Sequence, residues 1–388
     1  MKITDTEKCF GCGACQQICP KNAISMVPDS EGFLRPEVNE ELCVNCGLCQ
    51  KACPAESVTL CTGEKKAYAL KHKEDAKRQK ATSGGAFIAL SDAVLEQSGV
   101  VYGVIYNEEW KAVHTRATSR RERDPMCGSK YVQSDCGDTF AQAAEDLKSG
   151  KLVLYTGTSC QIDGLQHYLK LKNIPTDTLV TVGLICHGAP SPLMWQEHLN
   201  NIRARRNKEI AGYAHRSKVR GWHEHNEQIT YVDGTKEYYT KLSQNHKDLF
   251  YGHFIVRPSC TLCPYAPEPY AADITIADFW GCEDLMPEID DNKGVSLVLI
   301  NSQKGQTLLD SCDDVTLWEV DRSEAMGHNH QKPCNPHPQR AQFWEDYRQH
   351  GYLFVCSKYA QDSFKGRILY GGKKRLRALL VKLKILHV

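Results

Sequence analysis

The sequence predicts an α+β protein in which a small cysteine-rich domain precedes a larger α/β domain. Two observations lead to this prediction. Eight of the 19 cysteines fall within the first 53 residues, where one spacing occurs twice. From about Lys65 onward, short apolar runs typical of buried strands alternate with helical patterns. Such alternation is typical of an α/β layer with a largely parallel sheet.

The composition is that of a globular chain of two or three domains. It has 388 residues, of which 41% are hydrophobic and 24% charged, as in ordinary folded proteins. No apolar run reaches the ~18–20 residues that a transmembrane helix needs. The polar start MKITDTEKC lacks the apolar core of a signal peptide. We therefore expect a cytoplasmic protein without nucleic-acid partners, whose thiols are metal ligands or redox groups rather than disulfides.

The N-terminal cysteines form an internal repeat with a period of 34 residues. Each copy reads Cys-x2-Cys-x2-Cys-x3-Cys-Pro. This is the run of bacterial ferredoxins, in which the fourth Cys ligates the other of two clusters. Zinc also takes four thiolates, but it does not require this run twice. We assign one 4Fe–4S cluster to Cys9, Cys12, Cys15 and Cys53, and a second to Cys43, Cys46, Cys49 and Cys19.

Three strand–turn–helix units follow this ferredoxin-like segment. In α/β sheets, ligands lie beyond the carboxyl ends of the strands, and the loops SGGA, TGTSC and CHGAP fall at such positions. The glycines of SGGA would suit an anion, although two glycines before a helix are more often a turn. We expect strands over 152–155, 179–185 and 294–302, and helices that begin near Ser83–Gly85, at Cys160, and at Pro192 with Ser191 as its cap.

Four later cysteines lie on loops of the α/β part. Cys160 opens a helix, Cys186 ends a strand, and Cys260 and Cys263 form a CxxC between prolines. They would suit a third cubane or a zinc ion, but spacing alone favours buried structural cysteines equally. For Cys282 and Cys334 both interpretations, metal ligand and structural cysteine, stay open. The remaining cysteines are interpreted as structural: Cys61, Cys127, Cys136, Cys312 and Cys356.

Two histidine features have both a functional and an ordinary interpretation. His187, next to Cys186, would move a proton beside a redox centre, or would simply bond its own backbone. The group from His328 to His337, which includes Cys334, has the composition of a metal site. Its irregular spacing favours a solvated loop.

The C-terminal segment differs in charge from the rest of the chain. From Phe364 onward it carries eight Lys/Arg and no acid, and without it the net charge is −7. Leucines at helical spacing, from Leu376 to Leu386, alternate with these cations. The pattern fits a helix on anionic lipid, which would place the protein peripherally at the inner membrane surface, or a helix docked on a partner. A terminal helix packed on its own domain is the alternative.

Six ordered segments together resemble the coenzyme F420 hydrogenase/dehydrogenase beta-subunit family in its bacterial form. The resemblance covers about residues 1–345 and includes the two-cluster ferredoxin domain in front. The segments are ATSGGAF at 81–87, GSKYVQSD at 128–135, YTGTSCQIDGL at 155–165, CHGAPSP at 186–192, RPSCTLC at 257–263 and DITIADFWG at 273–281.

The resemblance implies an α/β flavin-binding domain of the F420 hydrogenase beta-subunit type, with FAD and a third 4Fe–4S cluster on Cys160, Cys186, Cys260 and Cys263. Lys130 would stabilise reduced flavin and His187 would move the proton, as catalytic residues. The implied flavin contacts are Ser83, Gly84, Gly85, Lys130, Tyr131, Thr156, Gly157 and Thr158. The implied domains are 1–60 (two-cluster ferredoxin), 65–145 (N-terminal region of the family), 146–345 (C-terminal flavin and iron–sulfur domain) and 346–388 (basic extension).

The chain departs from the family pattern at three places. Ser159 replaces the usual proline of GTPCQ, Ala271 and Ala272 stand where an Arg is common, and Ala277 stands where a Gly is common before DFWG. The missing Arg weakens the expectation of an anionic cofactor at that position. The resemblance also does not establish a deazaflavin as the substrate.

The implied function is that of an iron–sulfur flavoprotein oxidoreductase. It would move electrons between a small-molecule hydride carrier at FAD, F420-like or other, and 4Fe–4S clusters, a ferredoxin or another oxidoreductase subunit. Three alternatives stay open. They are an electron-transfer subunit without a substrate of its own, a cluster-bearing sensor or assembly factor, and a reductase for a cell-envelope polysaccharide or lipid-linked precursor, for which the basic tail is the only hint.

Overall fold

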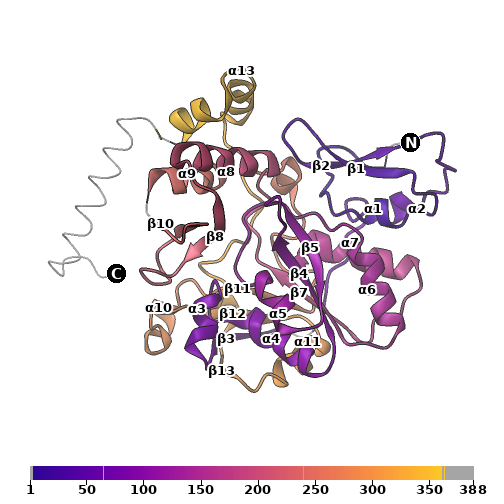
Figure 1. The fold of residues 1–388 in the computed structure, drawn as a ribbon. Helices are drawn as coiled ribbons and strands as arrows, with labels where there is room; N and C mark the ends of the chain where they lie inside the picture. Colours follow the sequence, from indigo (N-terminus) through magenta and orange to yellow (C-terminus); the bar gives the residue numbers. More distant parts are fainter. Residues whose placement is uncertain (1–2, 64, 239, 361, 363–388) are drawn as a thin grey trace.

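The computed structural model describes residues 3–63, 65–238, 240–360 and 362. It shows a small N-terminal domain beside a larger α/β domain (Figure 1). A second, smaller sheet and a helical layer extend the α/β domain. The expected C-terminal helix after Phe364 lies outside the described residues.

The N-terminal domain consists of two copies of one local structure. In each copy a short helix begins directly after a glycine with positive φ, +77° at Gly13 and +73° at Gly47. Side chains with a Cβ rarely adopt this conformation, so the repeat needs glycine here. The elements are α1 (Ala14–Gln17), β1 (Ile24–Pro28), β2 (Leu34–Val38) and α2 (Leu48–Lys51), with β1 and β2 antiparallel.

An eight-stranded mixed sheet forms the centre of the α/β domain. Its order is β13 (Val315–Glu319), β3 (Lys66–His72), β12 (Ser296–Ile300), β11 (Ile274–Asp278), β7 (Leu179–Leu184), β6 (Val153–Thr158), β4 (Val100–Tyr106) and β5 (Ala112–Ala117). The four strands β4, β6, β7 and β11 are parallel. The other four pair antiparallel with their neighbours. The prediction of a largely parallel sheet is therefore right for the centre and wrong for both edges.

Helices cover both faces of this sheet. Alternate residues of a strand point to opposite faces: Tyr102 and Tyr155 lie in one apolar cluster, Val101 and Leu154 in another. The first cluster also contains Ala14, so the N-terminal domain shares a core with the sheet. The first face is covered by α6 (Thr139–Lys148) and α7 (Ser159–Leu171), the second by α4 (Ala86–Glu96) and α11 (Gln303–Asp310).

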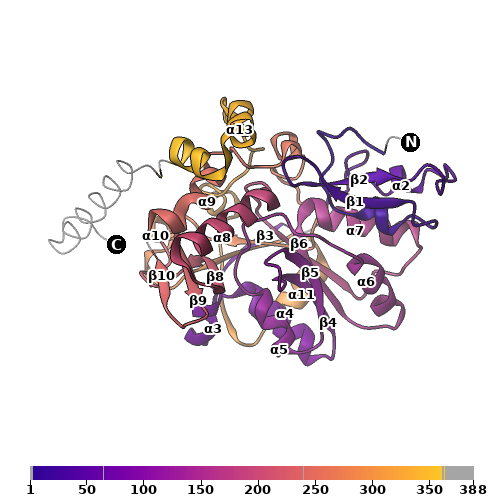
Figure 2. The same cartoon turned by 45° about the horizontal axis from the view of Figure 1, so that its top comes forward.

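The smaller sheet was not predicted from the sequence. Its three antiparallel strands pack against two helices through buried side chains such as Trp195 and Ile229. A further long helix lies over these two helices (Figure 2). The elements are β8 (Ile210–Ser217), β9 (Asn226–Tyr231), β10 (Lys236–Tyr238), α8 (Pro192–Arg206), α9 (Lys241–Tyr251) and α13 (Arg340–Tyr359).

The predicted local elements are confirmed. The hydroxyl of Ser191 accepts a hydrogen bond from the Met194 N–H, and Pro192 is the first residue of α8. Gly85 precedes α4 directly, and β6, β7 and β12 lie where strands were expected. Strands from both sides of the boundary expected at residue 145 share the central sheet. The short elements are α3 (Asp75–Lys80), α5 (Arg120–Arg123), α10 (Cys282–Leu285), α12 (Arg322–Ala325) and the 3-10 turns η1 (Asp124–Met126), η2 (Pro258–Leu262) and η3 (Pro287–Ile289).

None of the described helices combines the length and the apolar character that crossing a bilayer requires.

Candidate metal centres and the adjoining aromatic cluster

The first predicted cluster set lines one cavity of the N-terminal domain. Cys9, Cys12, Cys15 and Cys53 all border it. Three of these come from the first run and the fourth from the second, as the crosswise assignment expects. Burial, and then the neighbouring thiolates, raise the pKa of Cys15 to about 12. Thiolates placed this closely need a cation between them, so the donor set fits an iron–sulfur cluster.

The second predicted set lines another cavity at the opposite end of the repeat. Cys19, Cys43, Cys46 and Cys49 border it. Cys46 is exposed, whereas each member of the first set is buried. The second cavity is therefore the one nearer to solvent.

The four later cysteines also come together. Cys160 lies in the first turn of α7, Cys186 follows β7, and Cys260 and Cys263 lie on and after the turn η2. Burial raises the pKa of Cys186 well above its ordinary value, and thiolate charges on Cys260, Cys160 and Cys263 raise it further. Backbone N–H groups of the 186–189 loop donate to the sulfurs of Cys186 and Cys260 over 3.4 Å each.

A fifth thiol adjoins this group. Cys334 is buried, its S–H donates to the carbonyl oxygen of His187 over 2.8 Å, and its N–H donates to the carbonyl of Cys260. Sequence spacing left Cys334 open because the contact joins segments more than 70 residues apart. The histidines predicted near Cys334 have different neighbours from one another. His330 contacts the ring of His187, and His337 stacks on Phe254.

Helix α7 joins the first cavity to this later group. It begins at Ser159 beside Cys160, and one turn further on Gly164 faces Cys12. A Cβ at Gly164 would lie 3.0 Å from the Cys12 sulfur. Arg257 makes a second connection, because it bonds Cys9 while its charge also acts on the thiol of Cys260.

The predicted flavin residues of the Ser83–Gly85 turn lie at the sheet edge formed by the carboxyl ends of the parallel strands. Gly84 is required by packing, because a Cβ there would lie 2.1 Å from the carbonyl oxygen of Leu70. Ser83 donates to the carbonyl of Val295 over 2.6 Å. The polar groups of this turn thus have protein partners, which is the ordinary turn interpretation.

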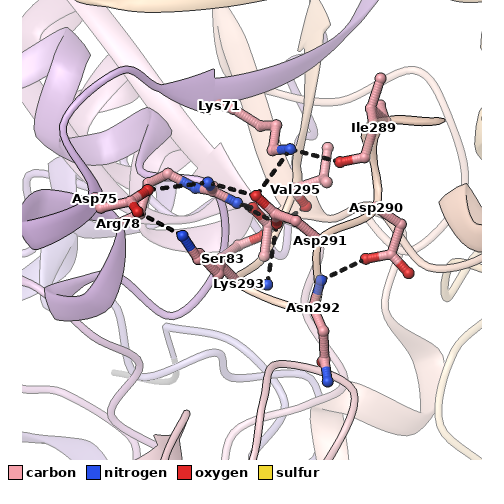
Figure 3. Close-up of polar contacts among 12 residues, drawn as sticks. Lys71, Asp75, Arg78, Ser83, Ile289, Asp290, Asp291, Asn292, Lys293 and Val295 are labelled. Carbon is pink, nitrogen blue, oxygen red and sulfur yellow. Dashed lines mark hydrogen bonds and ion pairs between the residues drawn. The ribbon is translucent and has the colours of Figure 1, made fainter. Parts of the chain in front are cut away.

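A polar network fixes the turn from outside (Figure 3). Arg78 forms two hydrogen bonds to the carboxylate of Asp291, at 2.8 and 2.6 Å, and a third to the carbonyl of Gly294. Lys71 adds an ion pair to Asp291 over 3.1 Å. This network connects α3 to the 289–295 loop, which directly precedes β12.

The other predicted flavin residues lie at the same edge. Thr156, Gly157 and Thr158 end β6, and the Thr158 hydroxyl caps α7 and lies 3.2 Å from the Cys160 sulfur. Lys130 donates to four backbone carbonyls of residues 125–128, and burial lowers its pKa to about 7. Tyr131 contacts aromatic rings of the smaller sheet and α9.

His187 lies between the thiol group and these rings. Its ring centroid is 4.7 Å from that of His330 and 6.3 Å from that of Tyr251. Burial, followed by the charge of His330, lowers its pKa to about 4. The ring is therefore neutral near pH 7.

Sequence reasoning missed an aromatic cluster next to His187. Trp280 stacks on Trp222 at 4.8 Å with an interplanar angle of 4°, and on His225 at 5.1 Å. The guanidinium of Arg216 lies 5.0 Å over the Trp280 ring and forms an ion pair with Asp278 over 2.9 Å. Asp278 and Trp280 belong to DFWG, and the other three lie in the segment HRSKVRGWHEH at 215–225, which is rich in Arg, His and Trp. The high content of Arg, His and Trp was the sequence signal that could have indicated this cluster.

Residues 150–325 match the family model that describes the C terminus of the beta subunit of coenzyme F420 hydrogenase/dehydrogenase. Residues 8–57 match the model of a 4Fe-4S dicluster domain. Residues 150–325 belong to the coenzyme F420 hydrogenase/dehydrogenase beta-subunit family. In this F420 hydrogenase beta-type chain the dicluster domain precedes the family's C-terminal region, as the sequence predicted. It is an iron–sulfur oxidoreductase-type electron-transfer protein.

Comparison with solved structures finds a chain of the F420-reducing NiFe hydrogenase complex from Methanosarcina barkeri. The identity is 16%, the match covers 67% of this F420 hydrogenase beta-type chain and 82% of that one, and the TM-score is 0.45. A comparison with the curated proteins finds no significant match.

Proposed function

We propose that this protein is an iron–sulfur flavoenzyme that exchanges electrons between a small-molecule hydride carrier and a one-electron partner. The observation that carries the proposal is the succession of thiol groups along the fold. Cys12 of the first cavity contacts α7 at Gly164, α7 begins beside Cys160, and the group of Cys160 adjoins His187 and the aromatic cluster.

A third 4Fe–4S cluster would be held by Cys160, Cys186, Cys260 and Cys263. The fit rests on the donor set, because burial and mutual repulsion raise the pKa of all four thiols and a bound cation would relieve both. Donation from backbone N–H groups to two of the sulfurs is typical of cluster sites.

FAD would bind at the sheet edge between the Ser83–Gly85 turn and the aromatic cluster. Arg216 supports this site, because its Nε is buried without a hydrogen-bond partner among the described residues. The aromatic rings of the cluster would border the flavin ring system, and Arg216 would neutralise negative charge. Bound there, the flavin would supply the conversion of a hydride into single electrons. His187 would accept or return the accompanying proton.

A second function has one observation in its favour. The exposed Cys46 makes the second cavity a suitable contact for a larger redox protein. The chain would then serve as an electron-transfer subunit that turns over only with its partner. The basic tail, the one hint of a cell-envelope substrate, lies outside the described residues.

The test is anaerobic reconstitution followed by counting of iron, acid-labile sulfide and flavin. The variants Cys160→Ser and Cys186→Ser should lose about four of roughly twelve irons, whereas Cys312→Ser should lose none. Cys312 is a matched control because its S–H donates to the Leu308 carbonyl, which a serine hydroxyl also does. Reduced deazaflavin, nicotinamides and ferredoxin are then offered as donors. Turnover without a protein partner separates an enzyme from an electron-transfer subunit.

A further inference from the structure

A further group of metal-ligating side chains lies between the smaller sheet and α9 and contains no cysteine. His215 on β8, Glu227 on β9 and His246 on α9 are each fully or almost fully buried. One ligand atom from each lies within 4.8 Å of the other two. The three residues come from three different elements, so their convergence is a property of the fold and not of one short segment.

Polar atoms of this group lack partners. Neither ring nitrogen of His246 has a hydrogen bond in the described structure, nor does Oε2 of Glu227. The neighbours include the rings of Trp195 and Tyr213. Buried polar atoms in native proteins are almost always paired, and orphaned ones are costly in apolar surroundings. A cation between the three side chains would satisfy these atoms together.

His215 has the hydrogen bonding of a metal ligand. Its Nε2 lies 2.7 Å from the hydroxyl of Tyr106, and its Nδ1 lies 3.2 Å from Oε1 of Glu227. Ligating histidines typically bond an outer partner through the nitrogen that faces away from the metal. Tyr106 would fill that role and leave Nδ1 directed at the site.

A neighbouring histidine provides an internal contrast. His198 is equally buried, and its ring centroid lies 5.6 Å from that of His246. Its two nitrogens are bonded to the hydroxyls of Tyr352 and Tyr213, at 3.1 and 2.9 Å. His198 is thus satisfied by protein partners, whereas His246 is not.

We propose that His215, Glu227 and His246 bind a divalent transition-metal ion, zinc by the type of its ligands. Two imidazoles and one carboxylate are ordinary zinc ligands. The three protein ligands leave a fourth position at the ion, which a water molecule would fill. The ion would tie β8 and β9 to α9. Because Arg216 follows His215 directly in the chain, the bound ion would also hold Arg216 beside Trp280.

The test uses the full-length protein, first reconstituted with iron and sulfide so that the cysteine sites are filled. Zn²⁺ is then added in slight excess, and loosely bound ion is removed with a chelator. Zinc is counted by mass spectrometry, and its ligands are determined by X-ray absorption. We expect about one zinc per chain with nitrogen and oxygen ligands at about 2.0–2.2 Å, and no sulfur at about 2.3 Å.

The variants Glu227→Gln and His246→Ala should lose this zinc while iron and sulfide stay unchanged, and His198→Gln should retain it. Wild-type protein that binds no zinc, zinc with sulfur ligands, or zinc retained in both ligand variants would each overturn the proposal. Should a ligand variant fail to fold, the ligand set of the wild-type zinc decides the question without it.

Discussion

Arg257 donates from Nε to the backbone carbonyl oxygen of Cys9 over 2.7 Å, and from Nη2 to the sulfur of the same cysteine over 3.4 Å. The two residues are 248 positions apart in the chain, and Arg257 is 1% exposed. A buried positive charge therefore lies against a predicted ligand of the first cluster. Nη1 is held by the side-chain oxygen of Gln133 over 2.7 Å, which fixes the orientation.

This contact predicts a shift in the reduction potential of the first cluster. A nearby positive charge and a hydrogen bond to sulfur each favour the reduced cluster, which is the more negative state. Replacing Arg257 by Gln removes both of these interactions. The potential of that cluster should fall by on the order of 60 mV, a tenfold change in a one-electron equilibrium. Redox titration followed by electron paramagnetic resonance measures it. An unchanged potential with the cluster intact would show that the contact is only structural.

Gly164 predicts a steric limit on the same cluster. Because a Cβ there meets Cys12 at 3.0 Å, Gly164→Ala should be tolerated with a small shift and Gly164→Leu should expel the first cluster. The second cluster, whose cavity does not include Cys12, serves as the internal control. The measurement is the intensity of the two paramagnetic signals. Equal loss of both clusters in Gly164→Leu would indicate general unfolding instead.

His114 predicts a stability that falls in mild acid. Burial lowers its pKa to about 4, and the neutral ring lies between the carbonyl oxygen of Thr156 and the thiol of Cys136. As the pH falls from about 6.5 toward 4, His114 becomes protonated in the unfolded chain but stays neutral in the folded protein. The folded state therefore loses stability over this range. Between pH 7 and pH 5 the wild type should lose about 1–2 kcal/mol more than His114→Gln. Anaerobic urea unfolding at the two pH values measures this difference. Parallel curves for the two proteins would contradict it.

The aromatic cluster predicts where flavin affinity resides. Trp280→Leu removes the central ring of the aromatic cluster and Arg216→Gln removes the adjacent charge, so each should weaken FAD binding by about tenfold or more without loss of iron. Trp344→Leu on α13 is the control, because Trp344 belongs to a different apolar cluster from Trp222 and Trp280. Fluorescence titration with FAD gives the dissociation constants. Equal affinities in all three variants would place the flavin elsewhere.

The crosswise grouping of the N-terminal cysteines could be expected from sequence because a 34-residue repeat encodes it locally. The turns at Gly85 and Ser191 could be expected for the same reason: their residues determine the local backbone and the cap. These features need no knowledge of distant segments.

Other features depend on long-range contacts. The smaller sheet was missed because buried polar residues such as His215 and Glu227 interrupt the alternation by which strands are recognised. The antiparallel pairing on that side of the central sheet depends on the direction in which β12 runs between β11 and β3. No local sequence pattern encodes this direction. The contacts of Arg257 with Cys9 and of Cys334 with Cys260 are likewise visible only after folding.

The count of iron, acid-labile sulfide and FAD per chain, made on one anaerobically reconstituted sample, tests the central claim most directly. The proposed function predicts about twelve irons, about twelve sulfides and one FAD, with four irons lost in Cys160→Ser. About eight irons, no flavin and no change in Cys160→Ser would contradict it, and would leave the two clusters of the dicluster domain as the redox groups of the chain.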